Sequence, residues 1–188
     1  MSLTYIFTFA SAFCRIAIGI VFLLSFGSKA RDIAQFQRSV AGFRLLSRKL
    51  SHIAAIFFLG GELAVVLCLL IGGELLLPGF GLAVLLLLVF TIALISVLVR
   101  KLSISCNCFG SSEEPVVVAD VWRNVGLIIC TVVGYSSTAW VQGNEQSLGI
   151  GGWLLAGVSA LLLSLLWLQL RNIVQLFSDD DSSSTEQI

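Results

Sequence analysis

Residues 82–99 read LAVLLLLVFTIALISVLV, and this stretch contains no charged side chain. An α-helix rises about 1.5 Å per residue, so about 20 apolar residues are needed to cross the hydrocarbon core of a bilayer. With the residues just before it, the stretch predicts a transmembrane span at about 76–99, with a turn at Pro78-Gly79 ahead of its main apolar run. The chain is therefore expected to lie in a membrane.

Four further apolar runs of similar length accompany this span. They cover about residues 5–28, 52–73, 119–141 and 150–171, and tryptophans bracket the last two. Tryptophan is enriched at both membrane–water interfaces, so its placement supports these two spans. The sequence predicts an all-α integral membrane protein, with a four-helix membrane domain over residues 1–141 and a fifth, C-terminal transmembrane helix.

The composition agrees with a membrane protein and excludes several other classes. Only 12% of the 188 residues are charged and 57% are hydrophobic, against about 25% and 45–50% in soluble domains. Net charge is zero and no basic patch is interleaved with aromatics, so no nucleic-acid partner is expected. There is no phosphate-binding or dinucleotide-binding glycine motif. The single histidine, His52, excludes most imidazole-based metal and triad chemistry.

Two segments outside the spans have distinct patterns. Residues 29–50 place apolar side chains three or four positions apart, with basic and polar residues mainly between them. The pattern predicts an amphipathic helix, which could lie in the lipid interface or pack on its own protein. Residues 178–188 are acidic and rich in serine, a composition typical of disorder.

Two of the five cysteines stand apart from the others. Cys14, Cys68 and Cys130 fall within apolar spans, where a thiol usually behaves as a small hydrophobic side chain. Cys106 and Cys108 instead share a connection with Asn, Gly and Ser. A disulfide across one intervening residue closes a tight ring, and strained, exposed disulfides tend to be labile or catalytic. The start of the following helix, with Lys101 and Arg123 nearby, could favour the thiolate.

Metal binding is a second interpretation of this pair. Two soft thiolates could hold Cu(I). A structural zinc site normally needs four protein ligands, and Cys106, Cys108 and His52 supply three at most. No metal site is therefore assigned, and a copper carrier is kept as an alternative.

Two charges within the apolar runs form another candidate site. Arg15 lies in the first span and Glu62 in the second. An ionisable residue inside a membrane is by default a functional-site hypothesis with a partner to be named. We expect these two to pair between the first two spans, either as a structural ion pair or as a proton-handling site.

These residues together resemble the MauE family, the methylamine utilisation membrane proteins, which are related to DoxX-like membrane proteins. The resemblance covers roughly residues 10–140, and its most specific element is Cys-x-Cys-Phe-Gly between the third and fourth spans. The matching residues are Arg15, Gly19, Phe22, Lys29, Glu62, Cys106, Cys108, Phe109, Gly110, Arg123 and Asn124.

The resemblance implies a four-helix membrane bundle that supports maturation of the disulfide-rich small subunit of methylamine dehydrogenase, alongside a thioredoxin-like partner. Cys106 and Cys108 would be the catalytic thiols of a membrane thiol–disulfide oxidoreductase, and a quinone is a conceivable electron acceptor. A non-enzymatic accessory subunit for a redox partner is the main alternative. The expected partners are the lipid bilayer, a thioredoxin-like protein and a disulfide-containing substrate protein.

Two arguments about membrane orientation conflict. Ten of the eleven basic residues lie at or beside the face that carries the Cys-x-Cys pair, and the positive-inside rule makes that face cytoplasmic. Disulfides, however, persist outside the cytoplasm, and the family resemblance favours the same side. We expect a multi-pass protein of the cell membrane with the Cys-x-Cys face outside the cytoplasm.

Overall fold

A computed structural model describes residues 3–42, 48–100, 118–141 and 148–183, and this part of the chain is almost entirely helical, without strands. The long helices are α1 (Leu3–Arg31), α3 (Arg48–Ile71), α4 (Leu76–Val99), α5 (Val118–Val141) and α6 (Ile150–Ser183), with the short α2 (Ile33–Gly42) and the 3₁₀ helix η1 (Gly73–Leu75) between them. The predicted all-α architecture is confirmed.

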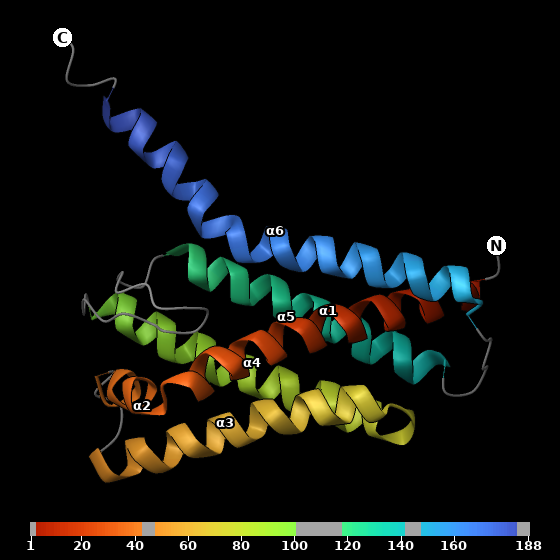
Figure 1. The fold of residues 1–188 in the computed structure, drawn as a ribbon, viewed down its shortest axis with the longest axis horizontal. Coiled ribbons are helices and arrows are strands. Elements are labelled where there is room, and N and C mark those ends of the chain that lie inside the picture. The colour runs from red at the N-terminus through yellow and green to blue at the C-terminus, as the bar shows by residue number, and fades with distance from the viewer. Residues whose placement is uncertain (1–2, 43–47, 101–117, 142–147, 184–188) are drawn as a thin grey trace.

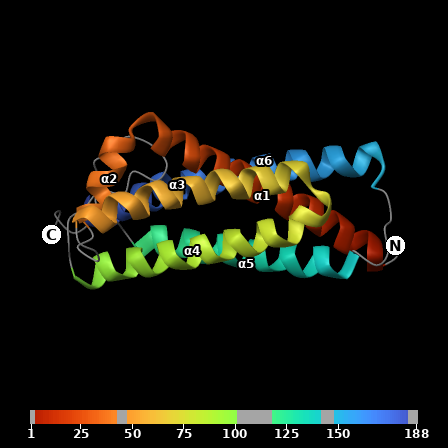
Figure 2. The same ribbon diagram turned by 90° about the horizontal axis from the view of Figure 1, so that it is seen from below.

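Four of the long helices form a closed bundle (Figures 1 and 2). Helix α1 packs against α3 and α5, and α4 packs against the same two helices, so each member has two neighbours. Successive members run in opposite directions. Helix α6 lies outside this ring, where it packs mainly against α1, and the short α2 packs on α3 at the end of the bundle where α1 finishes.

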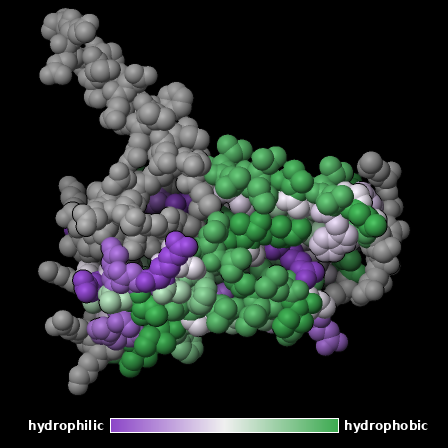
Figure 3. Space-filling view, viewed as in Figure 1, coloured by the Kyte–Doolittle hydropathy of each residue, from purple (hydrophilic) through white to green (hydrophobic). Residues whose placement is uncertain are grey.

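The bundle has an apolar core and an apolar outside. Ile18, Val65, Phe80 and Ala83 are fully buried between the helices. Large side chains such as Phe57, which is 81% exposed, cover the outer faces, and Figure 3 shows a hydrophobic flank with hydrophilic residues gathered toward the α2 end. Water would disfavour such a surface, whereas lipid tails accept it.

Within the described ranges, four helices are long and apolar enough to cross a membrane. They are Leu3–Arg31, Leu50–Ile71, Gly73–Val99 and Asp120–Val141, which overlap the four spans predicted for the membrane domain. This chain is therefore a multi-pass membrane protein.

The break between α3 and α4 does not lie where the sequence predicted it. The chain reverses at Gly72 and Gly73, whose φ angles are +77° and +60°, a region that L side chains rarely adopt. Pro78 lies in the first turn of α4, where its missing N–H costs nothing because those donors have no partner within the helix. The predicted turn at Pro78-Gly79 is wrong.

An amphipathic helix lies in the predicted segment 29–50, but it is shorter than predicted. Helix α1 continues to Arg31, α2 covers only Ile33–Gly42, and α3 already begins at Arg48. The physical reason is Asp32, whose Oδ1 accepts a hydrogen bond of 2.8 Å from the backbone N–H of Gln35. This is an N-cap contact, and it starts a new helix directly after α1. Residues 43–47 lie outside the described part.

Helix α6 extends further than predicted. It runs from Ile150 to Ser183, although disorder was predicted from Ser178 onward; residues 184–188 lie outside the described part. No glycine or proline follows Gly157 in the chain, so neither of the two strongest helix breakers interrupts α6. Helix α6 follows the bundle from the end where α1 begins and then bends away (Figure 1).

The fifth span remains a prediction, which the membrane topology tests. The apolar part of α6 with described side chains, Ile150–Leu166, is shorter than the other four candidates. If α6 crosses the membrane, reporter proteins fused to the two termini will report opposite sides. The same fusion placed after Val141, at the end of α5, serves as the control and should match the N-terminal signal. Equal signals from both termini would exclude a fifth span.

Candidate functional site

The candidate site begins with the buried face of α1. Four buried residues follow one another there at spacings of one, three and four: Val21, Phe22, Ser25 and Lys29. These spacings place them on the side of α1 that faces the bundle. Because α1 continues past Ser28, the side chain of Lys29 is held inside the protein and is only 3% exposed.

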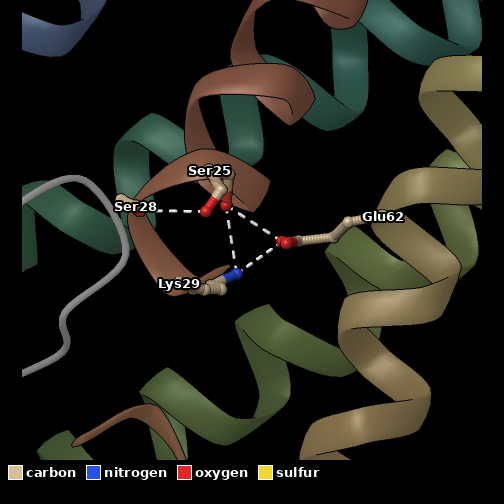
Figure 4. Close-up of polar contacts among 4 residues, drawn as sticks. All are labelled: Ser25, Ser28, Lys29 and Glu62. Carbon is tan, nitrogen blue, oxygen red and sulfur yellow. Dashed lines mark hydrogen bonds and ion pairs between the residues drawn. The ribbon is translucent and has the colours of Figure 1, made fainter. Parts of the chain in front are cut away.

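Lys29 forms an ion pair with Glu62 of α3 (Figure 4). Its Nζ donates to Glu62 Oε1 and to Ser25 Oγ, the latter at 3.0 Å. Ser25 Oγ in turn donates to Glu62 Oε1 at 2.9 Å. Glu62 is also only 3% exposed. The three side chains therefore form one buried polar cluster that joins α1 to α3, which we call the Lys29 cluster.

Three aromatic rings surround the ammonium group of this cluster. The Lys29 Nζ lies 5.2 Å from the ring centroid of Phe36, 5.2 Å from that of Phe58 and 5.3 Å from that of Phe90. These rings belong to α2, α3 and α4. The negative face of an aromatic ring attracts a cation within about 6 Å. One lysine on α1 therefore contacts three other helices.

Asn124 of α5 completes the surroundings of the cluster. It lines a cavity of about 30 Å³ together with Ser25, Lys29 and Glu62. Asn124 Nδ2 and Glu62 Oε2 are buried and have no hydrogen-bond partner among the residues that the structure describes. A cavity of this size can hold a water molecule, which could accept from the amide and donate to the carboxylate. The sequence-predicted residues Lys29, Glu62 and Asn124 are thus brought together.

The predicted pairing of Arg15 with Glu62 is wrong. Arg15 Nε donates to the backbone oxygen of Leu69 at 2.6 Å, and its Nη2 donates to that of Leu70 at 2.9 Å. Both oxygens belong to the last turn of α3, where carbonyl groups have no partner within the helix. Lys29 lies 14 residues beyond Arg15 on α1, about 21 Å along the axis, and it reaches Glu62 instead.

The contact between Arg15 and the α3–α4 turn leads to a prediction for Gly72. This residue has φ +77° and ψ −153°, a conformation almost exclusive to glycine that costs about 1–3 kcal/mol for other residues. A Cβ there would lie 2.8 Å from Arg15 Nη2. We expect Gly72→Ala to lower the free energy of unfolding of the detergent-solubilised protein by at least about 1–3 kcal/mol, which thermal unfolding measures.

Gly73→Ala is the matched control for this substitution, because a Cβ at Gly73 would meet nothing within 4 Å. It should cost less than Gly72→Ala, since only the backbone conformation opposes it. Equal losses for the two variants would show that the Arg15 contact adds nothing.

Arg123 lies one residue before Asn124 on α5 and is buried. Its Nη2 lies 3.4 Å from Asp120 Oδ1, one turn earlier on the same helix. From the sequence, Arg123 was expected to favour a thiolate in the Cys-x-Cys connection. In the structure, it forms an ion pair with Asp120.

The predicted catalytic pair lies outside the described residues. This applies to Cys106, Cys108, Phe109 and Gly110, so their role remains a prediction. Helix α4 ends before this connection and helix α5 begins after it. The end of α4 and the start of α5 both lie at the α2 end of the bundle (Figure 1).

The three cysteines within the spans are free thiols. Cys14 Sγ and Cys130 Sγ lie 3.5 Å apart, between α1 and α5. Cys14 belongs to the apolar core and Cys130 packs against it. Cys68 is half-buried. No group of three or more potential metal ligands occurs among the described residues.

Sequence reasoning missed Ser25 and the three phenylalanines around Lys29. The available signal was the spacing of four residues between Ser25 and Lys29, which extends the buried face of α1 by one more turn. The phenylalanines come from three separate helices, so no local pattern identifies them.

Fold and site together define a multi-pass membrane protein built on a four-helix bundle with a buried lysine–glutamate pair. The chain matches the family described as methylamine utilisation protein MauE over residues 7–137. It is also 32% identical over 156 residues to the methylamine utilization protein MauE of Paracoccus denitrificans, covering 80% of this chain and 81% of that protein. The chain belongs to the MauE family. No solved structure matches it significantly.

Proposed function

We propose that this chain is a membrane thiol–disulfide redox protein that supports disulfide formation or maturation of a partner protein. The observation that carries the proposal is the pair Cys106 and Cys108, separated by one residue and attached between α4 and α5. The membership in the MauE family supports it, since the similar Paracoccus protein is named for methylamine utilization. By resemblance to the MauE family, the proposed substrate is the small subunit of a methylamine dehydrogenase.

The exchange needs only thiols and disulfides. A partner thiolate attacks one sulfur of the Cys106–Cys108 disulfide, and the other sulfur leaves as a thiolate. A second partner thiol then attacks the mixed disulfide, which gives an oxidised partner and two reduced cysteines. Two electrons and two protons have then passed from the partner to this chain. The same steps in reverse, with the disulfide of a thioredoxin-like protein as the oxidant, restore the Cys106–Cys108 disulfide.

Among the described residues, the cavity at the Lys29 cluster cannot hold a quinone. The cavity at the Lys29 cluster, of about 30 Å³, is far too small for an organic cofactor, since such pockets typically measure about 300–1,000 Å³. A second cavity, of about 1060 Å³, is lined by Arg15, Glu74 and Trp153 and lies at the opposite end of the bundle from the start of α5. We propose that the exchange runs between protein thiols, since both candidate residues, Cys106 and Cys108, are thiols.

The Lys29 cluster supports this function as a scaffold. It ties α1, α2, α3 and α4 together through one ammonium group, and Asn124 adds the first turns of α5 to the same cavity. Both helices that hold the Cys-x-Cys connection, α4 and α5, are thereby fixed at one end of the bundle.

A cell-membrane location with the Cys-x-Cys face outside the cytoplasm fits this chemistry, because disulfides persist there. A membrane-impermeant thiol reagent should then label Cys106 or Cys108 in intact cells. The triple variant in which Cys14, Cys68 and Cys130 are replaced by alanine removes the background. Labelling that occurs only after the membrane is permeabilised would place the pair in the cytoplasm.

Trapping of a mixed disulfide tests the exchange itself. The resolving thiol is adjacent in the native protein, so the covalent intermediate is short-lived. Replacing the resolving cysteine by serine should leave the other linked to a thioredoxin-like protein or to the substrate, visible as a reducible adduct on a non-reducing gel. The double variant Cys106→Ser/Cys108→Ser must lose that adduct.

An adduct with neither single variant, together with full activity of the double variant, would favour the accessory role without redox chemistry. Activity that needs both thiols although they never oxidise would favour the Cu(I) carrier.

A further inference from the structure

A large cavity lies at the end of the bundle opposite the Lys29 cluster. It measures about 1060 Å³ and is lined by the first half of α1, the η1–α4 turn, the end of α5 and the start of α6. Its walls therefore come from segments near one end of each span. The ends of transmembrane spans lie where the headgroups of a bilayer meet the hydrocarbon core.

Two opposite charges line this cavity, Arg15 and Glu74. Among the described residues, the two do not approach within ion-pair distance of each other, since the ion pairs found there are those of Lys29 with Glu62 and Arg123 with Asp120. The carbonyl contacts use Arg15 Nε and Nη2, and the ring of Trp153 lies 6.0 Å from its guanidinium carbon. The guanidinium is thus fixed in place at the cavity wall.

The remaining lining is part hydroxyl and part apolar. Ser11 Oγ and Thr138 Oγ1 are hydrogen-bonded at 2.7 Å, and Thr8 lies one turn before Ser11 on the same wall. Leu76, Leu77 and Leu148 supply apolar surface. Figure 3 shows hydrophilic residues interrupting the hydrophobic flank toward the end where α1 begins.

We propose that this cavity binds the headgroup of a zwitterionic phospholipid with a primary ammonium group, the chemistry of phosphatidylethanolamine. The phosphate would face the N–H groups of Arg15 that the two carbonyl contacts leave over, because these groups donate to phosphate oxygens. The ammonium group would face the carboxylate of Glu74, and the glycerol and upper acyl chains would contact the leucines. The cavity is large enough for such a headgroup with the upper part of its chains.

The two charges also determine which lipids are disfavoured. An anionic lipid such as phosphatidylglycerol would satisfy Arg15 through the same phosphate, but its neutral glycerol group would leave the carboxylate of Glu74 without a cation. A choline headgroup carries the charge but has no N–H to donate to the carboxylate. The site should therefore prefer ethanolamine over both choline and glycerol headgroups.

Lipid retention by the full-length protein tests this proposal. The protein is reconstituted into vesicles with equal parts of phosphatidylethanolamine, phosphatidylcholine and phosphatidylglycerol, extracted in mild detergent, and its bound lipids are quantified by mass spectrometry. We expect ethanolamine lipid to be enriched at least several-fold over each of the others. Glu74→Gln should abolish the preference over phosphatidylglycerol, and Arg15→Gln should reduce retention of all three.

Two variants control for effects on charge and on folding. Arg31→Gln, an exposed arginine at the other end of α1, is the charge-matched control and should retain the wild-type preference. Glu74 is exposed, so Glu74→Gln leaves the fold intact even if Arg15→Gln disturbs the end of α3. Equal retention of the three lipids by the wild-type protein, or an unchanged preference in Glu74→Gln, would overturn the proposal.

Discussion

Replacing either Lys29 or Glu62 alone by an apolar residue is expected to destabilise the folded bundle by about 3–5 kcal/mol, because the remaining charge is left buried without its partner. Suitable changes are Lys29→Met and Glu62→Leu. Each group is only 3% exposed, so neither can turn to water. Denaturant-induced unfolding of the solubilised protein measures the loss.

The double variant Lys29→Met/Glu62→Leu should be milder than either single variant. It removes both charges together, and replacing a buried ion pair by apolar side chains is often close to neutral. Ser25→Ala is the control within the cluster and should cost only about 1 kcal/mol, since one neutral donor is lost from a pair that persists. Losses that simply add in the double variant would contradict the pairing.

Glu62→Gln separates the structural role of the pair from a proton-handling role. Glutamine keeps the size of the side chain and can still accept from Lys29 and Ser25. We expect a modest loss of stability with activity in proportion to the amount of folded protein. Normal folding with no activity would instead assign proton transfer to Glu62.

The second large effect concerns the cysteines. Cys106→Ser/Cys108→Ser should reduce the yield of disulfide-bonded partner protein to the level of cells that lack this chain, because the proposed exchange uses these two thiols. Cys14, Cys68 and Cys130 lie within spans and are free thiols. Replacing each by alanine should leave that yield nearly unchanged, which provides the matched control. Loss of yield in the control variants would shift the redox role into the bundle.

The spans could be predicted from the sequence, and most of their contacts could not. Apolar runs such as that of α4 have few structural alternatives in a membrane, because every backbone polar group must be paired within the helix. The four spans were therefore predicted with most ends within a few residues. The exact ends of the helices depend on local contacts instead. One example is the N-cap at Asp32, which lies directly after α1 and starts α2.

Errors of a few residues at helix ends changed the predicted site. Ending the first helix at Ser28 placed Lys29 in an interfacial segment, and Arg15 was then the remaining cation for Glu62. In the structure α1 is one turn longer, so Lys29 is buried and Arg15 instead binds the carbonyl groups at the end of α3. The importance of Lys29, Glu62 and Asn124 was visible from the sequence, whereas their mutual contacts required the packing of three helices.

The redox state of Cys106 and Cys108 in living cells tests the central proposal most directly. Cells are quenched with acid, free thiols are alkylated, and the two cysteines are analysed by mass spectrometry in the variant that lacks Cys14, Cys68 and Cys130. We predict that the pair is found both as an intramolecular disulfide and as two thiols, with the balance shifting when the partner protein is removed. A pair that stays fully reduced in both strains would contradict the proposal.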